Sequence, residues 1–133
     1  MGAPMRVLVV DDSAVVRELI AVNLQLEGFD VTTAADGDAA LELVAEVDPH
    51  VITLDVVMPN LAGFDTVQRL RSLPETAHIP IVVVTGRAQA TDVARGEQFG
   101  VEAYLTKPFE PAELVKVVTR LATSGQQPAD DEV

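Results

Sequence analysis

Five short runs rich in Val, Ile and Leu alternate along this chain with longer amphipathic stretches, and this alternation constrains the fold more than any other feature. Such alternation is typical of an α/β fold in which helices cover both faces of a parallel sheet. The predicted strands are Arg6–Val10, Asp30–Ala34, Val51–Asp55, Pro80–Val84 and Glu102–Leu105. The first, third and fourth are almost entirely apolar, as strands buried on both faces should be, whereas the second and fifth are more polar and are expected at the edges. The sequence therefore predicts a doubly wound, five-stranded parallel sheet.

The stretches between the strands carry apolar residues at helical spacing, and we expect these faces to cover the sheet. The first three predicted faces are Val15, Leu19, Val22 and Leu26; Ala40, Val44 and Val47; and Phe64, Val67 and Leu70. A fourth helix, about 88–99, has a thin apolar face and an internal glycine, so it should be soft. The fifth begins near Glu110, because Pro111 suits a first helical position, and its apolar stripe is Leu114, Val117, Val118 and Leu121. Five helices are expected in all.

The length of 133 residues supports one domain and leaves no room for a second of comparable size. We expect an N-terminal extension over 1–5, a folded domain over 6–122 and an acidic, disordered tail over 123–133. The absence of cysteine excludes disulfides and thiolate metal sites, and no run resembles a signal peptide or a membrane span. The net charge of −12 opposes direct binding to nucleic acid or anionic lipid. These features predict a cytoplasmic protein whose partners are proteins or small ligands.

Polar residues follow four of the predicted strands. Asp11 and Asp12 follow the first strand, Asp55 ends the third, Thr85 follows the fourth and Lys107 follows the fifth. Because parallel strands all point the same way, these side chains should meet at the carboxyl edge of the sheet, where ligands bind in doubly wound folds. The sequence thus predicts a site with three carboxylates, a hydroxyl and an ammonium.

Three crowded carboxylates repel one another, and either raised pKa values or a hard divalent cation relieves that repulsion. Magnesium is the natural candidate. A metal held by carboxylates beside a lysine and a hydroxyl suits a phosphoryl group, and a carboxylate can serve as its acceptor. Asp55 is the best placed acceptor, since it ends the apolar strand in the middle of the chain, and Asp11 and Asp12 would then hold the metal.

Each of these residues also has an ordinary interpretation. Asp-Asp-Ser at a strand end is typical of a helix N-terminus with capping side chains. Asp55 would be a turn residue, Thr85 a strand former, Tyr104 a core aromatic and Lys107 a solvated charge. Their joint occurrence at one sheet edge favours the functional interpretation. For the two histidines, His50 and His78, a satisfied or exposed role is favoured over ligation or catalysis.

With these residues in this order, the sequence resembles the receiver domain of two-component response regulators, of the single-domain chemotaxis type. The resemblance spans about Arg6 to Ala122 and implies a flavodoxin-like fold with strand order 2-1-3-4-5. Four stretches carry it, in the family's order: Val9-Val10-Asp11-Asp12-Ser13; Leu54-Asp55-Val56-Val57-Met58-Pro59 with Gly63; Val84-Thr85; and Tyr104-Leu105-Thr106-Lys107-Pro108-Phe109.

The resemblance implies a magnesium-dependent phosphoryl transfer to Asp55 from a phosphohistidine of a histidine kinase or histidine phosphotransfer protein. Asp12, Asp55 and the main-chain carbonyl of Val57 would ligate Mg²⁺ directly, and Asp11 would do so through water. Lys107 would contact a phosphoryl oxygen. Such a protein catalyses only its own phosphorylation and dephosphorylation, so it is not an enzyme in the usual sense.

The resemblance also implies a switch. Once Asp55 is phosphorylated, the Thr85 hydroxyl would bond another phosphoryl oxygen and Tyr104 would turn inward behind it. This change would alter the face made by the fourth helix, fifth strand and fifth helix, where a downstream target protein would bind. The family implies a cis bond at Lys107–Pro108 as well. Ala103 stands where members that dimerise through that face often carry an aspartate, so we expect a monomer when unphosphorylated.

Two other hypotheses remain. The first is a receiver-like interaction module that acts independently of phosphorylation, although the complete set of acceptor, acid pair, threonine and lysine argues against it. The second is a flavin-binding protein of similar strand order. That function needs a phosphate-binding loop after the first strand, where this chain instead has Asp11 and Asp12, which repel phosphate unless a metal intervenes.

Overall fold

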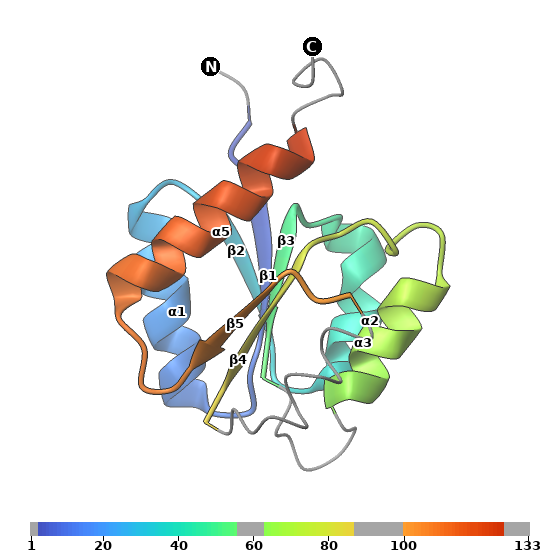
Figure 1. Ribbon diagram of the computed structural model, residues 1–133, viewed down its shortest axis with the longest axis horizontal. Helices are drawn as coiled ribbons and strands as arrows, with labels where there is room; N and C mark the ends of the chain where they lie inside the picture. Colours follow the sequence, from blue (N-terminus) through green and yellow to red (C-terminus); the bar gives the residue numbers. More distant parts are fainter. Residues whose placement is uncertain (1–2, 56–62, 87–99, 127–133) are drawn as a thin grey trace.

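The computed structural model describes residues 3–55, 63–86 and 100–126, and within them the chain forms a five-stranded sheet covered by helices on both faces (Figure 1). All strand pairs are parallel and the order is β2-β1-β3-β4-β5, which confirms the predicted order and places the second and fifth strands at the edges. The strands are β1 Arg6–Val10, β2 Asp30–Ala34, β3 Val51–Leu54, β4 Ile81–Thr85 and β5 Ala103–Thr106. The helices are α1 Ala14–Leu26, α2 Gly37–Val47, α3 Gly63–Ser72 and α5 Pro111–Gln126. The fourth predicted helix, about 88–99, lies outside the described residues.

Alternate side chains of the central strands enter two separate cores, one on each face of the sheet. On one face, Leu8 and Val10 of β1 pack with α2 and α3; on the other, Val7 and Val9 pack with α1 and α5. Figure 1 shows this division, with α1 and α5 on one side of the sheet and α2 and α3 on the other. The continuous apolar character of these strands follows, because both of their faces are buried. None of the helices described here is long and apolar enough to cross a bilayer.

The face that α1 turns to the sheet differs from the predicted one. Val15, Leu19, Val22 and Leu26 were expected to be buried, but their side chains are 79%, 45%, 43% and 78% exposed. The prediction was wrong because α1 carries two apolar stripes, and helical spacing alone does not choose between them. The stripe that packs on the sheet comprises Ile20, Ala21 and Leu24, with Val16 partly buried against the same core. The predicted stripe is therefore a surface feature.

The predicted faces of α2, α3 and α5 do pack on the sheet. Their buried members are Ala40, Val44, Val67, Leu70, Leu114, Val118 and Leu121. The start of α5 at Pro111 is confirmed, but its end is not, because the helix continues to Gln126 and so takes up the first residues of the predicted tail. Backbone hydrogen bonds can extend a helix beyond its apolar stripe, which ends at Leu121 and Ala122, and no apolar pattern in the sequence marks that final turn. The hydroxyl of Thr123 donates to the carbonyl of Thr119 at 2.7 Å within it.

The two histidines have ordinary structural roles, as expected. Nδ1 of His50 accepts a hydrogen bond from the backbone N–H of Arg6 at 2.9 Å, which ties the loop before β3 to the start of β1. Burial, with the nearby Arg6 charge, lowers the pKa of His50, so the neutral form that can accept this bond is favoured at neutral pH. His78 is exposed in the loop before β4.

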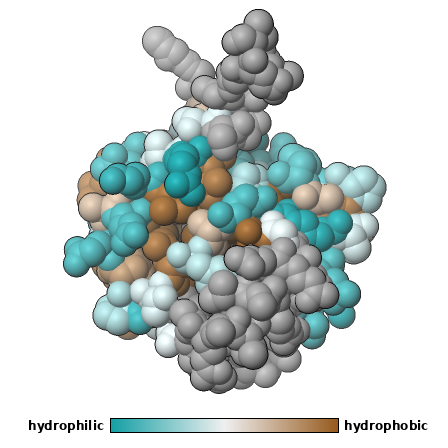
Figure 2. Space-filling model, in the orientation of Figure 1, coloured by the Kyte–Doolittle hydropathy of each residue, from teal (hydrophilic) through white to brown (hydrophobic). Residues whose placement is uncertain are grey.

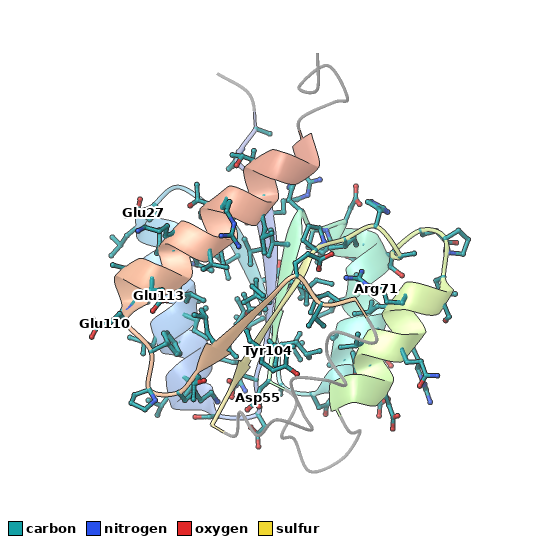
Figure 3. The ribbon with its side chains drawn as sticks, viewed as in Figure 1. Glu27, Asp55, Arg71, Tyr104, Glu110 and Glu113 are labelled. Carbon is teal, nitrogen blue, oxygen red and sulfur yellow. The ribbon has the colours of Figure 1, made fainter. Side chains whose placement is uncertain are left out.

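Arg71, near the end of α3, joins three segments that are distant in sequence (Figure 3). Its guanidinium donates to the carbonyls of Ala77, Ile79 and Gly100 at 3.0, 2.7 and 2.8 Å and to the carboxylate of Glu102 at 2.9 Å. Glu102 also accepts the backbone N–H of Ile81 at 2.7 Å. This network fixes the loop before β4 and the segment that enters β5.

Replacing Arg71 with methionine should lower the free energy of unfolding by about 1.5–2 kcal/mol, since hydrogen bonds to charged groups contribute about 1.5–3 kcal/mol and the partly buried carbonyl of Ile79 loses its donor together with three exposed acceptors. Urea unfolding followed by circular dichroism measures the change. Arg69→Met removes the same charge from the same helix and should change stability by less than about 0.5 kcal/mol. Equal effects of the two variants would contradict the role of this network.

Candidate functional site

The carboxyl ends of the strands bring together the predicted acidic residues. Asp11 follows β1 and Asp55 follows β3, and their side chains are buried, with 1% and 4% of their surface exposed, whereas Asp12 is exposed. The backbone N–H of Asp55 donates to the carbonyl of Val10 at 3.0 Å, so the two strand ends are held side by side. Figure 3 shows Asp55 at this end of the sheet. The prediction that three separate acids meet at one edge is confirmed, because one oxygen of each lies within 4.8 Å of the others.

Lys107 reaches the same place from the loop after β5. Its Nζ lies 2.9 Å from Oδ2 of Asp11 and 3.0 Å from Oδ2 of Asp55, so the ammonium bridges the two buried carboxylates. Burial of the ammonium lowers its pKa, but the hydrogen bonds and charges of Asp11 and Asp55 raise it more, and the pKa of Lys107 therefore lies above its ordinary value. The lysine stays charged at neutral pH. The expected cis bond at Lys107–Pro108 is present.

The loop between β1 and α1 has regular capping geometry as well as acids. Ser13 is the N-cap of α1, where its side chain accepts the N–H of Val16 at 3.3 Å. The N–H of Ser13 itself donates to Oδ1 of Asp11 at 2.9 Å. The capping interpretation is therefore confirmed for Ser13, while Asp11 and Asp12 lie in the acidic cluster.

Arg17 is a neighbour of this site that could not be identified from the sequence. From α1 its Nη1 donates to the backbone carbonyl of Asp11 at 2.8 Å. The sequence does place an arginine one turn after the predicted helix N-cap, and a long side chain at that position can reach back over the preceding loop. That signal is weak, since most arginines at such positions extend into solvent.

Other predicted site residues are only partly described. Val57, the predicted carbonyl ligand, lies outside the described residues. The backbone of Thr85 ends β4 and pairs with Thr106 of β5, but its side chain is not described. Tyr104 pairs with Val83 of the neighbouring strand, is partly buried, and packs against the core shared with α2 and α3.

The donor set suits a hard divalent cation. In the described part of the chain three carboxylates face one bridging ammonium, so Lys107 alone does not neutralise the cluster. Mg²⁺ is bound by carboxylate and carbonyl oxygens at about 2.0–2.1 Å, and small side-chain movements would place these oxygens around one ion. A buried carboxylate beside a cation and a lysine can accept a phosphoryl group, because both positive charges neutralise the phosphoryl oxygens.

Comparison with known proteins agrees with this geometry. The family model described as the response regulator receiver domain matches residues 7–119. The DNA-binding response regulator MtrA of Mycobacterium tuberculosis is 38% identical over 126 residues, which are 94% of this chain and 54% of MtrA. The chain spans about half the length of the curated relatives it matches.

Two solved structures extend the comparison. The chemotaxis protein CheY4 of Vibrio cholerae has 35% identity and a TM-score of 0.85, over 90% of this chain and 99% of CheY4. The Mn²⁺-bound form of response regulator Rcp1 has 26% identity and a TM-score of 0.75, over 90% of this chain and 93% of Rcp1. The chain belongs to the response regulator receiver domain family of two-component signalling proteins.

Proposed function

We propose that this chain is a response regulator receiver domain that accepts a phosphoryl group on Asp55 from a phosphohistidine of a histidine kinase or histidine phosphotransfer protein. The observation that carries the proposal is the pairing of the buried Asp55 carboxylate with Lys107, next to Asp11 and Asp12. In an ordinary core such a cluster of acids would be costly, because buried carboxylates need partners. A function that uses the cluster explains why it is present.

In the proposed reaction the P–N bond of the phosphohistidine breaks and a P–O bond forms to a carboxylate oxygen of Asp55. Asp11, Asp12, Asp55 and the carbonyl of Val57 would hold Mg²⁺, which supplies charge neutralisation on the phosphoryl oxygens. Mn²⁺ binding by the relative Rcp1 supports a divalent cation here. Lys107 would place its ammonium against another phosphoryl oxygen. The chain would catalyse only its own phosphorylation and dephosphorylation.

Phosphorylation of Asp55 would change the packing of side chains between the site and the β5 edge of the sheet. Thr85 ends β4 and Tyr104 lies in the adjoining strand β5, so a movement of the threonine toward the phosphoryl group changes the packing around Tyr104. Partial burial of Tyr104 leaves it with one side toward the surface. We infer that a downstream target protein reads this change on the face of the fourth helix, β5 and α5.

The exposed stripe of α1 is the surface on which the phosphoryl donor would dock. It runs along the helix from Val15, three residues after Asp12, and its four members follow the alternating three- and four-residue spacing that packs against another helix. Hydrophobic residues also reach the surface on the side of α1 and α5 in Figure 2. Glu27, Glu110 and Glu113 lie on that side in Figure 3, which favours a donor helix flanked by Lys or Arg.

A double variant, Leu19→Gln with Val22→Gln, should accept phosphoryl groups from acetyl phosphate at the wild-type rate but at least about tenfold more slowly from a phosphorylated histidine phosphotransfer protein. Fully burying a Leu or Val side chain contributes about 1.5–3 kcal/mol, and about 1.4 kcal/mol corresponds to a tenfold change in binding. Radiolabel transfer from the donor measures the rate. Leu73→Gln removes an exposed leucine outside α1 and is the matched control. Unchanged transfer from the donor protein would place docking elsewhere.

The main alternative is a receiver-like module that acts independently of phosphorylation. No described feature requires it, and the paired Asp55 and Lys107 favour the first proposal. MtrA binds DNA, but the present chain matches about half of that regulator and carries a net charge of −12, so we propose no direct contact of this chain with nucleic acid.

The test is the intact mass of the protein after incubation with acetyl phosphate, with and without Mg²⁺. The proposal requires a gain of one phosphoryl group that depends on the metal. No gain in folded protein, with either acetyl phosphate or a phosphorylated histidine phosphotransfer protein, would favour the phosphorylation-independent module.

A further inference from the structure

Asp12 lies between two peptide groups that are both held in place. The peptide before it contributes the carbonyl of Asp11, which accepts a hydrogen bond from Nη1 of Arg17 at 2.8 Å. The peptide after it contributes the N–H of Ser13, which donates to Oδ1 of Asp11 at 2.9 Å. Asp12 itself is exposed. Its backbone is thus fixed on both sides, while its carboxylate projects toward the solvent side of the acidic cluster.

Arg17 can hold that carbonyl because α1 fixes its own position. Its backbone N–H donates to the carbonyl of Ser13 at 2.9 Å in the first turn, and Ile20 and Leu24 anchor the helix on the sheet. The side chain is partly buried and reaches back over six residues to Asp11. A planar guanidinium loses less conformational freedom per hydrogen bond than a lysine ammonium, so it suits a fixed contact with a carbonyl.

We propose that Arg17 is a positioning residue for the cation site, because its hydrogen bond to the Asp11 carbonyl orients the peptide that carries Asp12. The inference rests on the proposed function, in which Asp11 and Asp12 help to hold Mg²⁺. Groups that orient metal ligands without touching the metal commonly change metal affinity 10–100-fold when they are removed. Arg17 is such a group.

The charge of Arg17 and its hydrogen bond predict opposite changes in Mg²⁺ affinity when the side chain is removed. The guanidinium of Arg17 bonds to the main chain of one member of the acidic cluster, and its positive charge repels an incoming cation, so if charge alone mattered, removing Arg17 would tighten Mg²⁺ binding. If the hydrogen bond to the Asp11 carbonyl matters more, removing Arg17 lets the Asp11–Asp12 peptide rotate and weakens binding. The sign of the change therefore separates the two roles.

The experiment compares Arg17→Met, Arg17→Lys and the control Arg120→Met, which removes an equal charge from an exposed position on α5. Calorimetric titration with Mg²⁺ alone should show affinity about tenfold or more weaker for Arg17→Met, partial recovery for Arg17→Lys and a change of less than twofold for the control. Equal or tighter binding by Arg17→Met, with thermal unfolding that shows a folded protein, would overturn the inference.

A second measurement tests the same contact without metal. Amide hydrogen exchange at Asp12 and Ser13 should be at least about tenfold faster in metal-free Arg17→Met than in the wild type, because local opening of the loop costs less free energy. Arg17→Lys supplies this comparison if Arg17→Met does not fold. Unchanged exchange would overturn the positioning role. Wild-type protein that binds no Mg²⁺ would instead contradict the proposed function, and the exchange result would still decide the role of Arg17.

Discussion

Asp55→Asn is expected to abolish phosphoryl incorporation completely. The substitution keeps the shape of the side chain and one oxygen that can accept from Lys107, which lies 3.0 Å from the native carboxylate. It removes the anionic nucleophile, because a neutral carboxamide oxygen attacks phosphorus poorly and carries no charge for a cation. Intact mass after treatment with acetyl phosphate and Mg²⁺ should show no gain.

The matched control is Asp38→Asn, which neutralises an exposed acid in the first turn of α2, far in sequence from the site. This variant should gain one phosphoryl group like the wild type. Circular dichroism should confirm that Asp55→Asn retains its helices and strands. A mass gain that persists in folded Asp55→Asn would mean that another group is the acceptor.

Lys107→Met should change the phosphorylation rate and the Mg²⁺ affinity of the site in opposite directions. The rate of phosphorylation should fall by about 10²–10³-fold, as found when a single donor to a developing negative charge is removed. Mg²⁺ should bind more tightly, because the ammonium that bridges Asp11 and Asp55 no longer competes with the metal for these carboxylates. Time courses of mass gain and calorimetric titration measure the two effects.

Lys116→Met is the control for this variant. It removes an exposed lysine from α5 and should leave both the phosphorylation rate and the Mg²⁺ affinity unchanged.

The raised pKa of Lys107 also predicts how pH affects the ion pairs of Lys107 with Asp11 and Asp55. A group whose pKa is raised on folding stabilises the fold fully below its unfolded pKa and loses that contribution as the pH rises through its folded pKa. The lysine therefore remains charged through neutral pH, and a wild-type phosphorylation rate in Lys107→Met at pH 7 would contradict its role.

The sheet could be predicted from the sequence because its central strands, β1, β3 and β4, are buried on both faces. Such strands are continuous apolar runs, and the predicted bounds agree with β1 and β2 and differ by one residue in β3, β4 and β5. The orientation of α1 could not be predicted in the same way. Its sequence offers two apolar stripes, and which of them faces the sheet depends on the packing of Ile20 and Leu24.

The acids and the lysine of the site could also be predicted, because each immediately follows a strand and parallel strands end at one edge. Arg17 and Arg71 could not, since a long side chain bonds to whichever carbonyls the folded chain brings within reach. Both donate to main-chain oxygens six or more residues away. The carbonyl of Val57 and the hydroxyl of Thr85 remain predictions.

Because the site is built from segments that are distant in sequence, it forms late in folding. Asp11 and Lys107 lie 2.9 Å apart although 96 positions separate them, so the acid pair, the proposed acceptor Asp55 and the lysine meet only after the last strand has joined the sheet. A chain still emerging from the ribosome, or one cut by a protease after β3 and allowed to separate, has Asp11, Asp12 and the proposed acceptor Asp55 but lacks Lys107 beside them. The ability to be phosphorylated would then serve as a check on completed folding, and unfinished copies could not compete for the donor's phosphoryl group.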